Sequence, residues 1–279
     1  MVIVQRRASI PGRINIIGEH TDYLGGLALP FASDHRLVLT ATHAEQTTGD
    51  GTVVDLWHAA GGWPATLEVE STIPIGAGMS SSAALCLAIV LCAQGPQDAL
   101  AACKEAQRLE HQVLKTPCGL LDQMAMMMSS EKHAVLIDFA TMDCQPFRLP
   151  DDWLFKAVDS GIRRQLSETN FGASSDAQVL SRHATEENIR VRQALSASSV
   201  ELGALLNASH ASLQSIGVST PEIDDLVAHL QSTPGVLGAR MMGGGFGGMI
   251  LVAVEGSEIL PNVPLLKASH CGFLKEGFE

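Results

Sequence analysis

The chain has 279 residues, of which 46% are hydrophobic and 17% charged, and its formal net charge is −12. Its 18 basic side chains form no dense cluster, which argues against a nucleic-acid surface because phosphate backbones are bound by clustered cations. The six cysteines include no C-x-x-C pair and are typical of buried thiols in a reducing compartment. The N-terminal run does not resemble a signal peptide, and the apolar stretch at residues 85–93 is too short to cross a bilayer. We therefore expect a cytoplasmic protein.

The first half of the chain predicts strands followed by helices. Strands are expected at residues 1–10 and 13–17, separated by a turn at Pro11-Gly12, and again at residues 27–30, 36–43, 53–57, 65–69 and 134–139. Helices are expected at residues 80–93, 97–114 and 120–129.

The second half predicts a strand, three helices and a pair of strands. Strands are expected at residues 154–159, 235–242 and 249–254, and helices at residues 176–197, 200–215 and 221–231. The tail after Glu255 is weakly patterned. Strands and helices do not alternate regularly, which predicts an α+β fold. We place a domain boundary near residues 146–151, so that the expected domains are residues 1–148 and 149–279.

A stretch rich in glycine and serine, Pro74 to Leu85, joins a predicted strand to a predicted helix. Such a turn presents unpaired backbone N–H groups and the positive end of the helix dipole to an anion, and phosphate is the usual ligand. It is not a Walker A loop, because no lysine follows the glycines, and it lacks the third glycine of a dinucleotide fingerprint. The alternative is an ordinary strand–turn–helix joint with serine caps.

Residues 18–26 contain Glu19, His20 and Asp22 between glycines. Two carboxylates and an imidazole on a loop suit a ligand rich in hydroxyl groups, which needs hydrogen-bond acceptors at fixed spacing. The alternative is a surface loop whose polar side chains bond to their own backbone.

Two further carboxylates have two interpretations each. Asp122 lies at a helix start, where it either caps the helix or acts as a base towards a substrate hydroxyl group. Glu110 lies near a helix C-terminus, where the dipole disfavours a carboxylate, so it is either an exposed side chain or a ligand of Mg²⁺.

Two other features are ambiguous. The glycines of residues 243–248 allow a close backbone approach either to a ligand or to the first glycine loop. A group of charged and polar residues on one helix predicts a solvated face: His183, Glu186, Glu187, Arg190 and Arg192.

Four motifs in order resemble the galactokinases of the GHMP kinase superfamily. Residues 11–23 resemble the galactokinase signature, and residues 75–84 resemble the superfamily's phosphate-binding motif. Residues 118–123 are similar to the catalytic segment, and residues 238–248 resemble the third motif. Shorter stretches between them, at residues 187–191, 209–213 and 221–224, also look galactokinase-like, so the resemblance covers nearly the whole chain.

The resemblance implies a sugar 1-kinase that uses ATP and Mg²⁺, with two α+β domains and the active site in the cleft between them. Asp122 is then the base that takes the proton from the C1 hydroxyl group, and Arg13 stabilises the alkoxide and the transferring phosphoryl group. The implied sugar-binding residues are Glu19, His20, Thr21, Asp22, Gly119 and Phe171. The implied ATP-binding residues are Gly76, Ala77, Gly78, Met79, Ser80, Ser81 and Ser82. Ser82 and Glu110 are the implied ligands of Mg²⁺.

Three departures from the family pattern bear on substrate choice. Phe171 stands where the family usually has a tyrosine whose hydroxyl group contacts the sugar. The connection from Asp34 to Pro74 is short, and a segment that helps to hold adenine in the family is trimmed. Both ends of the chain are abbreviated.

The leading hypothesis is a galactokinase that makes galactose 1-phosphate. A kinase for a related sugar, such as an N-acetylated or C6-modified galactose, is the alternative that Phe171 suggests. A pseudokinase that only senses sugar and ATP is a third, but the complete serine motif and Asp122 disfavour it. The expected partner is a small sugar, with no nucleic acid or membrane. The sequence does not give the oligomeric state, and we take a monomer as the expectation.

Overall fold

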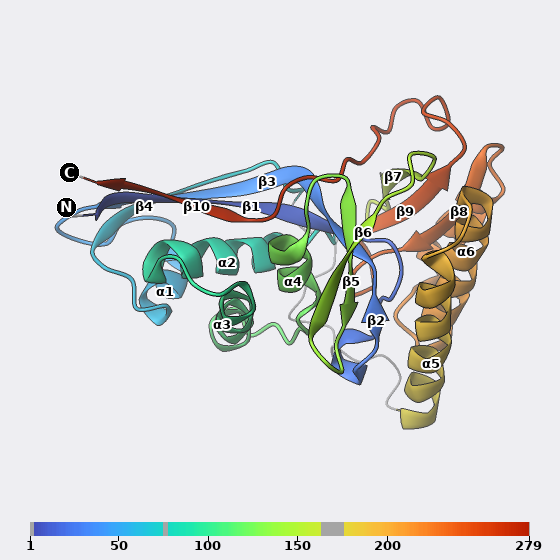
Figure 1. Cartoon of the computed structure of the whole chain (residues 1–279), viewed down its shortest axis with the longest axis horizontal. Helices are drawn as coiled ribbons and strands as arrows, with labels where there is room; N and C mark the ends of the chain where they lie inside the picture. Colours follow the sequence, from blue (N-terminus) through green and yellow to red (C-terminus); the bar gives the residue numbers. More distant parts are fainter. Residues whose placement is uncertain (1–2, 75–77, 163–175, 279) are drawn as a thin grey trace.

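A four-stranded antiparallel sheet forms the base on which the rest of the first half is built (Figure 1). The computed structural model describes residues 3–74, 78–162 and 176–278. The sheet has the order β10-β1-β3-β4, with β1 at Ile3–Asn15, β3 at Pro30–His43, β4 at Ala65–Ser71 and β10 at Phe273–Phe278. Pairing of β10 with β1 brings the two ends of the chain side by side.

Four helices lie on one side of this sheet (Figure 1): α1 (Gly51–Ala59), α2 (Ser81–Gln94), α3 (Ala99–Gln112) and α4 (Leu121–Met128). The helix α2 is apolar on every side, and its residues from Ala83 to Ala93 are buried apart from Leu85. A helix without a polar face must be covered all round. It packs against β1, β3 and α3. The N–H group of Arg13 donates to the carbonyl oxygen of Met79 at 3.4 Å, so the N-terminus of α2 lies close to the C-terminal end of β1.

Two three-stranded sheets complete the fold. One has the order β2-β5-β6, with β2 at Leu27–Ala28, β5 at His133–Asp138 and β6 at Asp143–Arg148. The other has the order β7-β9-β8, with β7 at Leu154–Asp159, β8 at Val236–Met241 and β9 at Met249–Val254. The last three helices are α5 (Ala177–Ala194), α6 (Ser199–Ser215) and α7 (Pro221–Gln231). Of these, α6 and α7 pack on β8, and α5 packs against α6 and β2.

The expected α+β class is confirmed, and most predicted elements lie within a few residues of their observed bounds. The predicted strand at residues 53–57 is wrong, because these residues belong to α1. Asp50 accepts hydrogen bonds from the N–H groups of Thr52 and Val53 and so caps that helix. Val53, Leu56 and Trp57 are buried at helical spacing, a pattern that a five-residue window cannot distinguish from a strand.

The predicted turn at Pro11-Gly12 is also wrong. The strand β1 continues through both residues, and its register against β3 shifts between Pro11 and Arg13. A bulge therefore takes up the irregularity that the proline and glycine introduce. The sequence patterns also missed β6 and β10. Their residues are mostly exposed or half-buried, so polar and apolar side chains do not alternate clearly enough to predict a strand.

The predicted solvated face on α5 is wrong for two of its members. Glu187 is 0% exposed and His183 is 1% exposed, whereas Glu186 is exposed as expected. The division into residues 1–148 and 149–279 remains a prediction. The strand β10 belongs to residues 149–279 by sequence, but it pairs with β1 in the sheet of the first half.

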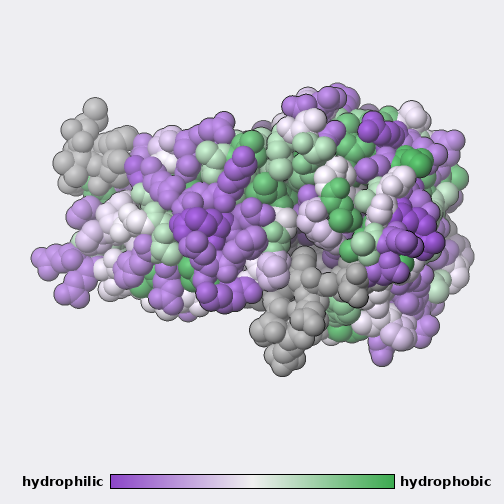
Figure 2. Space-filling view, turned by 90° about the horizontal axis from the view of Figure 1, so that it is seen from below, coloured by the Kyte–Doolittle hydropathy of each residue, from purple (hydrophilic) through white to green (hydrophobic). Residues whose placement is uncertain are grey.

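Within the described residues, no single helix has the length and apolar character needed to cross a membrane. The helices α2 and α3 meet that requirement only as a pair, and they are bent by 115° at their junction. In the space-filling view of Figure 2, hydrophilic residues cover much of the visible face, and hydrophobic residues appear between them in patches.

Arg6 fixes β10 and the C-terminal end of α2 to β1, whereas the neighbouring Arg7 is exposed. The Nε of Arg6 donates to Glu276 Oε1 at 2.8 Å, and its Nη1 lies 3.0 and 3.1 Å from the carbonyl oxygens of Cys92 and Ala93. The guanidinium thus neutralises the negative end of the α2 dipole and satisfies carbonyl groups that have no partner within the helix.

We predict that Arg6→Ala lowers the free energy of unfolding by about 2–3 kcal/mol, because it strands buried carbonyl groups and Glu276. The matched control, Arg7→Ala, should change it by less than about 0.5 kcal/mol. Urea unfolding followed by circular dichroism measures both variants. Equal effects of the two substitutions would contradict the role given to Arg6.

Candidate active site

The loop of residues 18–26 connects β1 to β2 and carries a short 3₁₀ helix, Asp22–Leu24. Thr21 shapes it, because its Oγ1 lies 2.9 Å from the carbonyl oxygens of both Gly18 and Leu27. Gly18 has a φ of +97°, and a Cβ there would overlap Ala28, so the loop requires glycine at its start. Thr21 is fully buried and is not among the residues that line the pocket described below. These contacts show that Thr21 shapes the loop, and its contact with a sugar stays a prediction.

Glu19 is held by side chains from distant parts of the chain. Arg240 on β8 donates from Nη2 to Glu19 Oε2 at 2.8 Å, and Asn15 donates to the same oxygen at 3.0 Å. Arg13 Nη2 lies 3.9 Å from the other oxygen, Oε1. Glu19 is 3% exposed and Arg240 is 0% exposed. A buried carboxylate needs such partners, and this set leaves Oε1 as the oxygen that can face a ligand.

Asp22 reaches across the pocket to the N-terminus of α4. Its Oδ2 accepts a hydrogen bond of 3.4 Å from the N–H group of Leu121, so an acid from the loop of residues 18–26 takes the position that a capping residue usually has. A Cβ at Gly119 would overlap the Asp22 carboxylate, which explains the glycine. Burial raises the pKa of Asp22 to about 6, with a further contribution from the nearby charge of Asp122.

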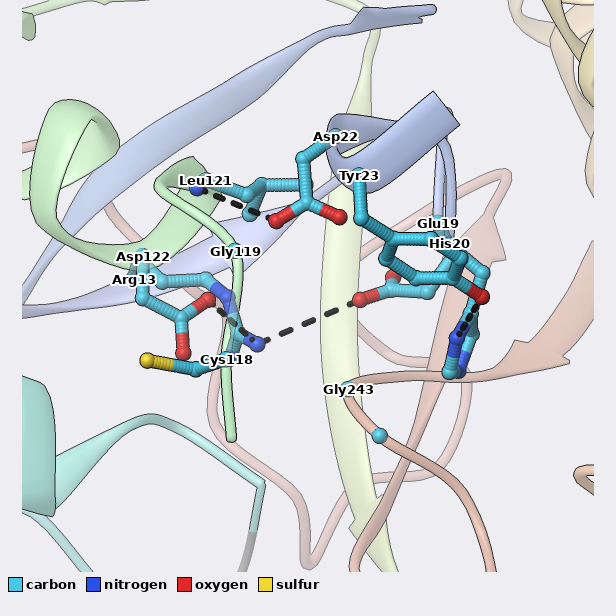
Figure 3. A pocket seen from close by; sticks show the side chains of 11 residues that line it. Arg13, Glu19, His20, Asp22, Tyr23, Cys118, Gly119, Leu121, Asp122 and Gly243 are labelled. Atoms are coloured by element: carbon cyan, nitrogen blue, oxygen red, sulfur yellow. Dashed lines mark hydrogen bonds and ion pairs between the residues drawn. The ribbon is translucent and has the colours of Figure 1, made fainter. Parts of the chain in front are cut away.

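Asp122 and Arg13 form an ion pair on the wall of the pocket (Figure 3). The distance from Arg13 Nη2 to Asp122 Oδ1 is 2.9 Å, and the side chain of Arg13 is 4% exposed against 26% for Asp122. Ser80 donates a hydrogen bond to the other oxygen, Asp122 Oδ2. The cap of α4 is Leu120, so Asp122 lies in the first turn with its carboxylate accessible. The capping alternative is therefore not what the structure shows.

The described part of the phosphate-loop candidate lies at the N-terminus of α2. Ser80 is the residue before that helix and adopts a left-handed conformation with φ of +61°, which is uncommon for a residue with a side chain. Gly78 accepts a hydrogen bond from Arg13 through its carbonyl oxygen, and Met79 is buried. Gly76 and Ala77 lie outside the described residues. The N–H groups of the first turn of α2 remain the reason to predict an anion here.

The second glycine loop packs against the first. A Cβ at Gly78 would lie 3.1 Å from the carbonyl oxygen of Met242, and a Cβ at Gly243 would lie 3.3 Å from the carbonyl oxygen of Gly78. Of the two sequence alternatives, contact with the first glycine loop is thus observed. Gly243 and Gly244 also line the pocket.

Glu110 lies beside the N-terminal turn of α2. Its Oε1 accepts from Ser82 Oγ at 2.6 Å, and its Oε2 accepts from Gln123 Nε2 at 2.9 Å. The carboxylate is 3% exposed, so the exposed alternative is wrong. Burial raises the pKa of Glu110 to about 7, and the charge of Asp122 acts in the same direction.

Ser82 and Glu110 suit a magnesium ion by their chemistry. A hydroxyl group and a carboxylate, completed by phosphate oxygens and water, are ligands that Mg²⁺ accepts. Glu110 is buried and makes no ion pair with a cationic side chain of the described residues, which supports the same view. Among the described residues, no group of three or more histidine, cysteine or acidic side chains forms a metal site, so a metal here depends on a bound phosphate for further ligands.

One pocket collects most of the predicted catalytic and sugar-binding residues (Figure 3). Its lining includes these predicted residues: Arg13, Glu19, His20, Asp22, Gly119 and Asp122. Phe171 lies outside the described residues. Sequence reasoning missed Tyr23, whose hydroxyl group lies 3.0 Å from His20 Nδ1, and Arg240, the partner of Glu19. The sequence did carry a signal for Arg240, which is an arginine within the apolar strand β8. A fully buried charge must have a partner.

Comparisons with known proteins agree with this arrangement. Three family models match: the galactokinase galactose-binding signature at residues 6–43, the GHMP kinases N terminal domain at residues 41–130 and the GHMP kinases C terminal at residues 191–261. A galactokinase of Thermotoga maritima is 31% identical, and the alignment covers 88% of each chain. A galactokinase of Mycobacterium bovis is 33% identical, and the alignment covers 88% of this chain and 87% of that one.

Solved structures show the same fold. The structure of Lactococcus lactis galactokinase complexed with galactose aligns with a TM-score of 0.80 at 24% identity, over 96% of this chain and 95% of that one. A mevalonate kinase aligns with a TM-score of 0.68 at 14% identity, over 97% of this chain and all of that one. With its three ordered family segments and relatives of this similarity, the chain belongs to the galactokinase family of GHMP kinases.

Proposed function

We propose that this protein is an ATP-dependent sugar 1-kinase whose substrate is D-galactose, with galactose 1-phosphate and ADP as products. The observation that carries the proposal is the ion pair of Arg13 with Asp122 on a pocket that Glu19 and Asp22 also line. The relatives named galactokinase, and the galactose complex of the Lactococcus lactis enzyme, support galactose as the sugar.

Asp122 acts as the base in this proposal. One of its oxygens takes the proton of the C1 hydroxyl group as the oxygen attacks the γ-phosphorus of ATP, and the bond to ADP breaks. Arg13 Nη2, 2.9 Å from Asp122 Oδ1, lies where it can stabilise both the attacking oxygen and the charge on the transferring phosphoryl group. Because Arg13 is nearly fully buried, its charge is little screened by solvent.

The hydroxyl groups of the sugar are assigned to the loop of residues 18–26. Glu19, His20 and Asp22 of that loop line the pocket, together with Tyr23. Carboxylates are acceptors only, so each fixes the direction of the hydroxyl group that it binds. Phe171 is proposed to cover an apolar face of the sugar.

ATP is proposed to bind with its phosphates against the residues that precede and begin α2, from Gly76 to Ser82. Ser82 and Glu110 would hold Mg²⁺, which when bound neutralises phosphate charge. We further propose that the enzyme acts in the cytoplasm, which the six free cysteine thiols support, and that it is a monomer. The domain division at residues 148 and 149 is kept as part of the proposal.

A coupled assay of ADP release over a panel of sugars tests the function. We expect turnover of galactose that requires Mg²⁺, and weak turnover of glucose, which differs only at C4. An enzyme that leaves galactose unchanged and phosphorylates an N-acetylated or C6-modified galactose would support the related-sugar kinase instead. Absence of turnover for every sugar, together with measurable sugar binding, would indicate a pseudokinase.

Asp122→Asn tests the base. The amide keeps an oxygen for Ser80 but cannot take a proton, so we expect kcat to fall by about 10²–10⁴-fold. The dissociation constant for galactose, measured by calorimetry, should change less than about tenfold, because Asp122 is one of several polar groups on the pocket. Asp143→Asn on the exposed part of β6 is the control. Normal turnover by Asp122→Asn would rule out this residue as the base.

Asp22→Asn tests the cost of a buried charge. The pKa of Asp22 rises in the folded enzyme from 3.8 to about 6, so the folded state binds the proton more tightly than the unfolded state. The stability contribution of this group is therefore lost as the pH rises from about 4 to 6, and above that the charged form costs about 3 kcal/mol.

We expect Asp22→Asn to raise the Tm of the ligand-free enzyme at pH 7.5 by about 5–10 °C, with little change at pH 4. The same variant should raise the KM for galactose about tenfold, because an amide replaces a charged acceptor. Thermal unfolding at both pH values gives the first quantity, and Asp55→Asn on the exposed side of α1 is the control. A lower Tm at pH 7.5 would contradict the expectation that the charged form of Asp22 destabilises the ligand-free enzyme.

A further inference from the structure

Three side chains of α5 bind the backbone of the loop of residues 18–26, which we call the sugar loop, and of Leu27 directly after it. They are His183, Glu187 and Asn188, at positions i, i+4 and i+5, which lie on one side of a helix. We call these three residues the α5 clamp. None of them lines the pocket, so their contacts are not explained by the reaction described above.

Glu187 binds the start of the loop. Its Oε1 accepts a hydrogen bond of 3.0 Å from the N–H group of Gly18 and one of 2.6 Å from Ser209 Oγ. Its Oε2 accepts from Arg190 Nε at 2.6 Å. The side chain is 0% exposed, and a fully buried carboxylate with every partner in place is a rigid support.

Asn188 and His183 bind two further points of the same loop. Asn188 Oδ1 accepts from the N–H group of Leu27 at 2.7 Å, at the other end of the loop. His183 Nε2 lies 2.9 Å from the carbonyl oxygen of Glu19, and its Nδ1 lies 2.8 Å from Ser212 Oγ on α6. These distances assign a protonated Nε2 that donates to Glu19 and an Nδ1 that accepts from Ser212.

We propose that Glu187 is a positioning residue for sugar binding, which with Asn188 and His183 fixes both ends of the loop that carries Glu19, His20 and Asp22. This inference rests on the proposed function for its effect on sugar binding. The three contacts are made to backbone groups, at Gly18, Glu19 and Leu27. They therefore fix the course of the loop while its side chains are left to the ligand.

The consequence is a specific kinetic signature. A loosened loop must become ordered again when sugar binds. The free energy of this ordering weakens sugar binding and so raises the KM for sugar. The nucleotide site at the start of α2 makes none of these contacts, so the KM for ATP should not change. A merely structural role would instead reduce the fraction of folded enzyme, which lowers the apparent kcat and leaves both KM values unchanged.

Glu187→Ala should raise the KM for galactose about tenfold or more, because it removes the charge-assisted hydrogen bond to the Gly18 N–H group at the start of the loop. Glu187→Gln keeps an oxygen for the Gly18 N–H group and should restore most of the affinity. The matched control is Glu186→Gln, because Glu186 is the neighbouring residue, lies 3.7 Å from the same Arg190 and is 48% exposed. It should leave both KM values unchanged. If Glu187→Ala does not fold, Asn188→Ala tests the other end of the loop and should raise the KM at least about threefold.

Hydrogen exchange gives a readout that needs no turnover. In Glu187→Ala, the N–H group of Leu27, which bonds to Asn188 and not to Glu187, should exchange at least about tenfold faster than in the wild type. The peptide of β7 should exchange at the wild-type rate. Unchanged exchange at Leu27 would overturn the clamp, as would equal rises of the KM for galactose and for ATP. Failure of the wild-type enzyme to phosphorylate any sugar would overturn the proposed function alone, because the exchange measurement still decides the clamp.

Discussion

The buried ion pair between Arg240 and Glu19 joins the two parts of the chain at the active site. Arg240 lies on β8 in the third sheet, and its side chain donates hydrogen bonds to the carbonyl oxygens of Asn15 and Ile16 and to Glu19. One guanidinium thus satisfies backbone groups at the end of β1 and a carboxylate on the sugar loop. Removal of Glu19 would leave the buried Arg240 without a carboxylate partner, and removal of Arg240 would leave Glu19 with only Asn15 and the more distant Arg13, so breaking the pair costs far more than the pair itself contributes. The geometry of the pocket depends on this contact.

The helix termini explain how an acidic chain can provide an anion site. The N-termini of α2 and α4 meet at Ser80 and Asp122, which share a hydrogen bond. Both helices therefore direct their positive ends towards the same small region. The only side-chain cation that lines this pocket among the described residues is Arg13. The carboxylates of Asp22 and Glu110 have raised pKa values because both are buried and lie near the charge of Asp122.

Local sequence signals predicted most of the fold and most of the pocket. The α7 helix was placed correctly from Thr220, Pro221 and Glu222, since cap chemistry is local. Glu19, Asp22 and Asp122 were predicted from their residue types within short motifs, and Arg13 from the resemblance to galactokinases; all four line the pocket. The strand β10 was missed because its partner β1 lies at the opposite end of the chain, and its own pattern is weak. No short window records such a partner.

The roles of Glu187 and His183 could not be predicted for a related reason. A glutamate and a histidine among charged neighbours on a helix are typical of a solvated face, and only the tertiary structure shows that α5 presents them to Gly18 and Glu19. These two residues lie more than 160 positions from the loop that they hold. Together with Arg240, they make the second half of the chain responsible for the shape of a sugar loop that belongs to the first half. The phosphate-loop candidate, in contrast, is built on α2 and α4 of the first half. Substitutions in α5 and β8 are therefore expected to act on sugar recognition before they act on the nucleotide.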